Sequence, residues 1–174
     1  MGFAEDCRDH AEVWGTERAR MTLSELPSET GLAPLMVAIK AQIRNACGPE
    51  ALRYVDDKCD KESATLVVTI GRRDGPRAVR KDGLQCELRA VLQRDPKRLQ
   101  ILHYAMSLYA PETATVAPRF LRWEFARERP AGTTALLHPL AHLHPGHERL
   151  RLPAPVLTIR ELVAQFCHIP PWWT

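Results

Sequence analysis

The chain has 174 residues, a formal net charge of +3 and five cysteines, and 45% of its residues are hydrophobic. This length suits one domain that can bury a sizeable core, and no apolar run is long enough to cross a membrane. The cysteines are widely spaced and form no CxxC motif, so the sequence suggests neither a zinc finger nor a disulfide framework. The N-terminus also lacks a signal-peptide pattern, and we therefore expect a cytoplasmic protein.

Charge is unevenly distributed along the chain. Residues 1–33 carry three basic and seven acidic side chains, a net charge of −4, whereas residues 71–98 carry nine basic and four acidic ones, a net charge of +5. The first segment lacks a sustained hydrophobic period, and residues 27–31 are typical of a linker. We predict a partly disordered acidic arm over residues 1–33 and a single domain over residues 34–174. The basic excess could face a polyanion, or it could belong to ordinary solvated turns.

A helix and a series of strands are predicted after the arm. Residues 34–47 carry one apolar stripe, with Pro34 suited to the first turn and Gly48 to the C-terminal cap. Residues 51–62 are ambiguous between a short strand at residues 52–55 and a charged turn. Further on, β-branched and alternating segments separated by short turns indicate strands. The predicted strands are residues 65–70, 84–92, 99–109, 119–127 and 136–144.

A second helix is predicted near the C-terminus. Thr158 and Glu161 have the spacing of a capping box, which marks a helix start. The residues that follow form one apolar stripe, consisting of Ile159, Leu162, Val163 and Phe166. Successive strands with short turns favour an antiparallel meander, and the two amphipathic helices can cover one of its faces. The predicted fold is α+β: an antiparallel meander of about five strands packed against N- and C-terminal helices.

Histidines gather in the last predicted strand and just after it. Four of the seven lie within ten residues, at positions 138, 142, 144 and 147. Side chains alternate between faces along a strand, so His138, His142 and His144 should share one face. Trp123 and Leu143 should face the other way.

The neighbouring strand should add charged groups to the histidine face. In a meander, residues 119–127 lie beside the histidine strand, which brings Arg122 and Glu124 close to the imidazoles. Imidazoles transfer protons near neutral pH, and guanidinium groups hold phosphates. The predicted catalytic residues are His142, His144 and Glu124, and the predicted phosphate-binding residues are Arg122, Arg149 and Arg151. Chemistry of this kind needs no cofactor.

The same residues allow other interpretations. A metal-binding module would use His138, His142 and His144, with Glu124 as a further ligand. A non-enzymatic interaction protein would dock its acidic arm and its Trp172-Trp173 end onto a partner, although packing onto the core is the simpler role for these tryptophans. The histidines could also be exposed side chains without chemistry.

Three segments of the C-terminal half form a recognisable series, consisting of His142–His144, Arg149–Pro155 and Thr158–Phe166. This series resembles the TumE-type toxin components of bacterial toxin–antitoxin pairs, over about residues 84–167. Glu124 and Gln165 stand where that family tends to have aspartate and an acidic residue. The resemblance implies a small bacterial cytoplasmic protein that acts on RNA or another nucleic acid and is neutralised by a cognate antitoxin.

Overall fold

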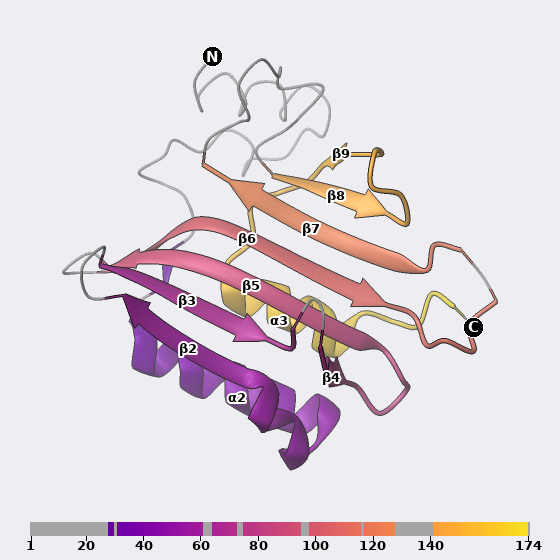
Figure 1. Ribbon diagram of the computed structural model, residues 1–174, viewed down its shortest axis with the longest axis horizontal. Coiled ribbons are helices and arrows are strands. Elements are labelled where there is room, and N and C mark those ends of the chain that lie inside the picture. Colours follow the sequence, from indigo (N-terminus) through magenta and orange to yellow (C-terminus); the bar gives the residue numbers. More distant parts are fainter. Residues whose placement is uncertain are drawn as a thin grey trace.

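The computed structural model of the chain describes residues 28–29, 31–60, 64–72, 75–94, 98–115, 117–127 and 141–173. These residues form one antiparallel sheet with two helices on one face (Figure 1). The predicted α+β class is confirmed. The described part of the sheet has nine strands rather than about five.

The sheet is a meander with two short additions. Its main path follows the chain in the order β2-β3-β5-β6-β7-β8-β9, and every pairing is antiparallel. The strands of this path are β2 (Val55–Asp60), β3 (Thr65–Ile70), β5 (Gln85–Arg94), β6 (Leu99–Tyr109), β7 (Phe120–Ala126), β8 (Ala141–Pro145) and β9 (Leu152–Pro153). Two further strands, β1 (Ser28–Glu29) and β4 (Ala78–Val79), pair with β6 and β5 respectively.

Strand β1 lies in the segment that we predicted as a linker. Glu29 is only 4% exposed, and its Oε2 atom lies 3.1 Å from Nε of Arg160. The other carboxylate oxygen accepts a hydrogen bond from the backbone N–H of Arg160. The sheet therefore begins before the predicted boundary at residue 34, while residues 1–27 of the predicted arm lie outside the described residues.

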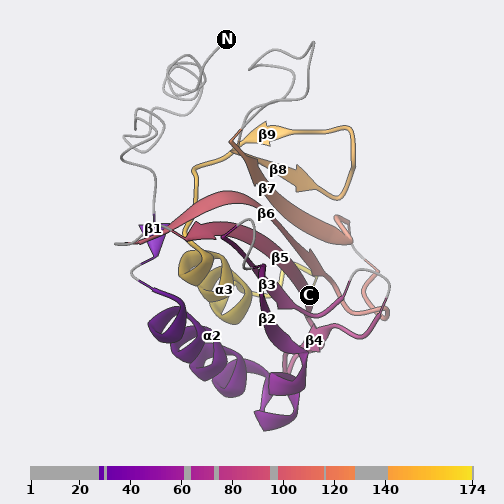
Figure 2. The same ribbon diagram turned by 60° about the vertical axis from the view of Figure 1, so that its left-hand side comes forward.

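Two helices cover the same face of the sheet, as predicted, and lie side by side (Figure 2). Helix α2 spans Leu32–Cys47, followed by the short 3-10 helix η3 (Pro49–Tyr54), and helix α3 spans Ile159–His168. Thr158 caps α3 in the predicted capping box: its hydroxyl accepts from the N–H of Glu161, whose carboxylate accepts from the N–H of Thr158. Both apolar stripes are buried, including Leu35, Ile39 and Ile43 of α2 and Ile159, Leu162 and Phe166 of α3.

Strand β6 contains a β-bulge that changes its alternation. Val91 of β5 pairs with His103, but Leu92 pairs with Ile101, so Leu102 is an extra residue in β6. Leu99 and Ile101 are buried on the helix side before the bulge, and the even-numbered residues Tyr104, Met106 and Leu108 are buried there after it. This change of phase explains why apolar residues occur at both odd-numbered and even-numbered positions of β6.

Strand β2 begins at Val55, later than the short strand at residues 52–55 that was one of the two alternatives for this segment. Every residue after Val55 in this strand is exposed, and four of them are charged. β2 is an end strand of the sheet, where charged side chains are common because they discourage pairing with another chain. Its hydrophobic pattern is therefore too weak to reveal it.

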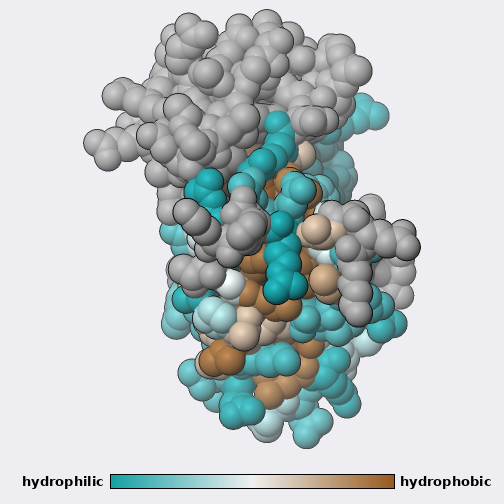
Figure 3. Space-filling view, turned by 90° about the vertical axis from the view of Figure 1, so that its left-hand side faces the viewer, coloured by the Kyte–Doolittle hydropathy of each residue, from teal (hydrophilic) through white to brown (hydrophobic). Residues whose placement is uncertain are grey.

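Some apolar side chains reach the surface. In Figure 3, brown apolar side chains form an interrupted band down the middle of the face, bordered by teal polar side chains. Among the described residues, the large hydrophobic side chains that are exposed are Val37, Val79 and Leu150. In the same part of the chain, no helix has the length and apolar character needed to span a bilayer.

Candidate functional site

The candidate site lies on β7 and β8, on the sheet face opposite the helices. In the register of these strands, Glu124 is the partner of His142 and Arg122 is the partner of His144. Trp123 and Leu143 form the pair between them and point to the other face. His142 and His144 therefore share a face, as predicted, and His138 lies outside the described residues.

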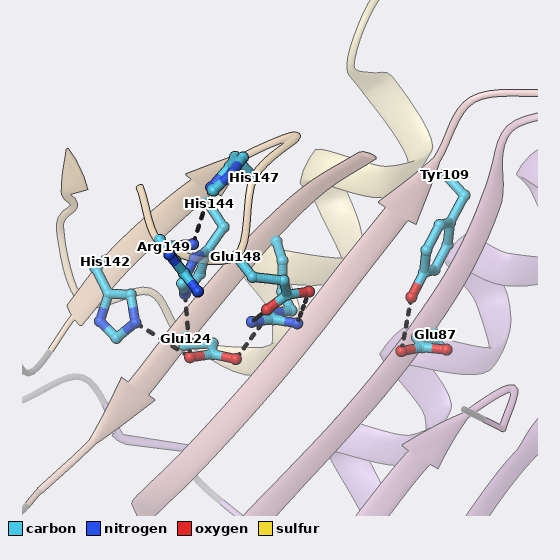
Figure 4. A network of polar contacts seen from close by, with 9 residues as sticks. Glu87, Tyr109, Glu124, His142, His144, His147, Glu148 and Arg149 are labelled. Carbon is cyan, nitrogen blue, oxygen red and sulfur yellow. Dashed lines mark hydrogen bonds and ion pairs between the residues drawn. The ribbon is translucent and has the colours of Figure 1, made fainter. Parts of the chain in front are cut away.

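Two imidazoles meet one carboxylate at the centre of this site (Figure 4). Nε2 of His142 lies 3.1 Å from Oε2 of Glu124, and Nε2 of His144 lies 3.4 Å from the same oxygen. The other oxygen, Oε1, lies 2.7 Å from Nε of Arg122. One atom of each of the three residues Glu124, His142 and His144 thus lies within 4.8 Å of the others, as a shared metal ion would require.

The two histidines are buried, which contradicts the interpretation of exposed side chains. His142 is 2% exposed and His144 is fully buried, while the side chain of Glu124 is 30% exposed. Strand β9 pairs with β8 at His142 and Leu143, on the side away from β7. Hydrophobic alternation gave the face of each side chain correctly, but it contains no information on whether that face is covered.

The surroundings fix the protonation states of two of these groups. The hydrogen bond with His142 and the positive charge of Arg122 lower the pKa of Glu124 from 4.5 to about 2, although burial opposes this shift. Burial lowers the pKa of His144 below its ordinary value of 6.5, against the attraction of Glu124. At neutral pH the carboxylate is therefore ionised and the His144 imidazole is neutral.

We expect the Glu124 carboxylate to make the metal-free protein sensitive to acid. Its pKa is lower in the folded protein than in the unfolded chain, so its contribution to stability is full above about pH 4.5 and disappears as the pH falls towards 2. Glu124→Gln should lower the free energy of unfolding at pH 7 by at most about 3 kcal/mol. Urea titrations with a chelator present should show the gap between the two proteins narrowing from pH 5 to pH 3. A gap that stays constant over this range would contradict the shift.

Arg122 is held between two carboxylates. Besides Glu124, it contacts Glu148, with Nη1 2.8 Å from Oε1 and a second, shorter contact from Nη2 to Oε2. The other two predicted phosphate-binding residues lie between β8 and β9, where Arg149 is exposed and Arg151 is half-buried. Of the three, only Arg122 contacts the carboxylate of Glu124 and lines the cavity beside it.

That cavity has a volume of about 1260 Å³ and lies on the same face of the sheet. Ala105 and Ser107 of β6 face it with small side chains, between the charged residues of β5 and β7. The charged and polar residues around them are Glu87, Arg89, His103, Tyr109, Arg122, Glu124 and Glu148. Glu87 and Arg89 of β5 are not among the predicted site residues, although the alternation of the predicted strand 84–92 places both on the face opposite its apolar residues.

A second polar network lies along the cavity from Glu124. The hydroxyl of Tyr109 donates to Oε1 of Glu87 at 3.1 Å (Figure 4). The guanidinium group of Arg77 lies 3.8 Å from the centre of the Tyr109 ring, and its Nε lies 3.4 Å from Oε2 of Glu87. The positive charge of Arg77 therefore already has two partners, an aromatic ring and a carboxylate.

The C-terminal tryptophans pack onto the domain. Nε1 of Trp172 donates to the carbonyl of Pro118 at 2.7 Å, and the two indole rings meet edge to face with centroids 4.8 Å apart. Both side chains are half-buried against the core. This is the packing role that we considered the simpler one.

Comparisons of the chain with models of protein families, with curated proteins and with solved structures give no match. The resemblance to TumE-type toxins stays a prediction.

Proposed function

We propose that Glu124, His142 and His144 bind one divalent transition-metal ion and that this centre is the functional site of the protein. The observation that carries the proposal is the convergence of the three ligand atoms within 4.8 Å of one another. Two imidazole nitrogens and one carboxylate oxygen suit Zn²⁺, and the same set with open positions suits non-haem Fe²⁺. These three residues belong to the metal alternative derived from sequence, whose remaining ligand, His138, lies outside the described residues.

The protonation states support this proposal. Metal ligands must be a neutral imidazole and an ionised carboxylate, which are the forms that His144 and Glu124 adopt at neutral pH. In the metal-free protein each Nε2 can donate its proton to Glu124. Binding of an ion at Nε2 would replace these hydrogen bonds and leave the ring proton on Nδ1.

Arg122 supports the same proposal from outside the ligand set. It contacts Oε1 of Glu124, whereas both histidines approach Oε2. A partner on the outer oxygen fixes the orientation of a carboxylate ligand and leaves the inner oxygen for the metal. A bound ion would supply a Lewis acid or an activated water next to the cavity.

The test of this proposal is the metal content of the purified protein. We expect one ion per chain after exposure to Zn²⁺ or Co²⁺ and removal of excess metal. Glu124→Gln should weaken the affinity at least about tenfold, since even the loss of a supporting partner has an effect of that size. His147→Ala is the matched control, because His147 lies in the same segment but is exposed and outside the ligand set. A wild-type protein that retains none of Zn²⁺, Co²⁺, Mn²⁺ or Fe²⁺ would exclude the centre.

A second candidate function is the action on RNA that the toxin resemblance implies. The observation that favours it is the presence of Arg53, Arg72 and Arg89 in the lining of the cavity that Glu124 also lines. Guanidinium groups hold phosphates, and His142 and His144 would then move protons without a metal. The protein would be cytoplasmic and bacterial, with a cognate antitoxin as its partner. Expression of the wild-type protein alone should then arrest growth and degrade RNA, and a harmless wild-type protein would remove this candidate.

A further inference from the structure

We infer that Arg89 binds an oxyanion, a carboxylate or phosphate group, at one end of a small substrate whose other end faces Glu124. This inference rests on the proposed metal centre, because it assigns the substrate class of that same site. The relevant residues lie on three neighbouring strands, with Arg89 on β5, Ala105 on β6 and Glu124 on β7.

The register of the sheet places Arg89 directly across the cavity from Glu124. Arg89 is the partner of Ala105 in β5 and β6, and Ala105 is the partner of Glu124 in β6 and β7. The three side chains therefore share one face, in a row across the sheet. Strands lie about 4.8 Å apart, so the backbones of Arg89 and Glu124 are separated by roughly 10 Å. Ala105 contributes only a methyl group between them, which leaves room for a small molecule.

Arg89 has a guanidinium group that the described residues leave available. It makes no hydrogen bond or ion pair with any of them, and it lines the cavity. In contrast, Arg77 contacts Glu87, and Arg122 contacts both Glu124 and Glu148. Arg89 is thus a cation beside the site whose charge no described carboxylate neutralises. A planar guanidinium group with five donors recognises the oxygen pairs of carboxylates and phosphates.

His103 supplies a second, independent observation at the same place. It lies next to Ala105 on the cavity face of β6, and its Nδ1 atom is buried without a hydrogen-bond partner among the described residues. Burial and the positive charge of Arg89 lower the pKa of His103, so its imidazole is neutral at pH 7. Because Nδ1 is closed to solvent, an anion held by Arg89 would accept the ring proton at Nε2 instead.

The test uses the full chain, metal-free and loaded with Zn²⁺, titrated with inorganic phosphate and separately with acetate. Binding is followed through the Nε–H signals of the arginine side chains in ¹⁵N–¹H spectra. We expect saturable shifts of the Arg89 signal with at least one of the two anions. Arg89→Gln should raise the dissociation constant for that anion at least about tenfold, which is the effect of losing a charge-assisted hydrogen bond. The amount of metal bound should not change.

Arg94→Gln is the matched control. Arg94 is exposed at the end of the same strand and does not line the cavity, so its loss should leave the dissociation constant unchanged. Equal anion affinity in the wild type and Arg89→Gln, or no saturable binding by the wild type, would overturn the inference. If the wild type binds no metal but loses its anion affinity on Arg89→Gln, the oxyanion subsite stands and the metal centre fails.

Discussion

Replacing both His142 and His144 with alanine should abolish metal binding, because it removes both nitrogen ligands and leaves one carboxylate. Metal that binds only the folded state stabilises the wild type, by about 2.7 kcal/mol at a concentration one hundred times the dissociation constant. The melting temperature of the wild-type protein should therefore rise with added Zn²⁺, and that of the double variant should not. Calorimetry with and without a chelator measures this difference. A double variant that keeps one ion per chain would show that the ligands lie elsewhere.

The same double substitution should also destabilise the metal-free protein. Both rings are buried and both contact Glu124, so their removal leaves a cavity and an ionised carboxylate with fewer partners. We expect a loss of about 2–5 kcal/mol, well above the 0.5 kcal/mol typical of exposed positions. His142→Gln combined with His144→Gln keeps N–H donors near Glu124 and more of the volume, and it separates the loss of ligands from the loss of packing. His147→Ala should have no effect on either measurement.

Phe166→Ala should be the most destabilising single change in helix α3. The ring is fully buried between this helix and the sheet, and it belongs to the main core cluster. Truncation of a buried Phe to Ala lowers the free energy of unfolding by about 3–5 kcal/mol. Urea titrations of the wild type and the variant measure the loss.

The neighbouring residue provides the control for that measurement. Gln165 lies in the same helix but is exposed, so Gln165→Ala should change the free energy of unfolding by less than about 0.5 kcal/mol. A loss below about 1 kcal/mol for Phe166→Ala would contradict the packing of α3 on the sheet.

The parts of the fold that could be predicted from sequence are those with a clear local signal. Strands β5 and β7 alternate strictly, and α3 combines a capping box with an apolar stripe, so local sequence is enough. Strands β1, β4 and β9 have two residues each and exist only because a longer strand lies beside them. Strand β2 is charged along most of its length. These four strands form through pairing with strands elsewhere in the fold, and a short window of sequence contains no information on such pairing.

The site could be predicted in part for a related reason. Side chains alternate between the two faces along β7 and β8, and this alternation alone places Glu124, His142 and His144 on one face. Burial of the histidines depends on segments distant in sequence, and it was missed. The position of Arg89 depends on the register across two strand pairs, which the sequence of one strand does not determine.

The bulge in β6 shows how this protein can change the shape of its cavity without changing its chemistry. If Leu102 were deleted, Ile101 and His103 would become neighbours, and the strand would alternate regularly from Leu99 to Tyr109. All the remaining side chains would keep their present faces. The extra residue is therefore not needed to separate core from cavity. A bulge bends its strand and increases the local twist, here next to His103. Gain or loss of one residue at this point would be an evolutionary route to a differently curved binding surface built from the same amino acids.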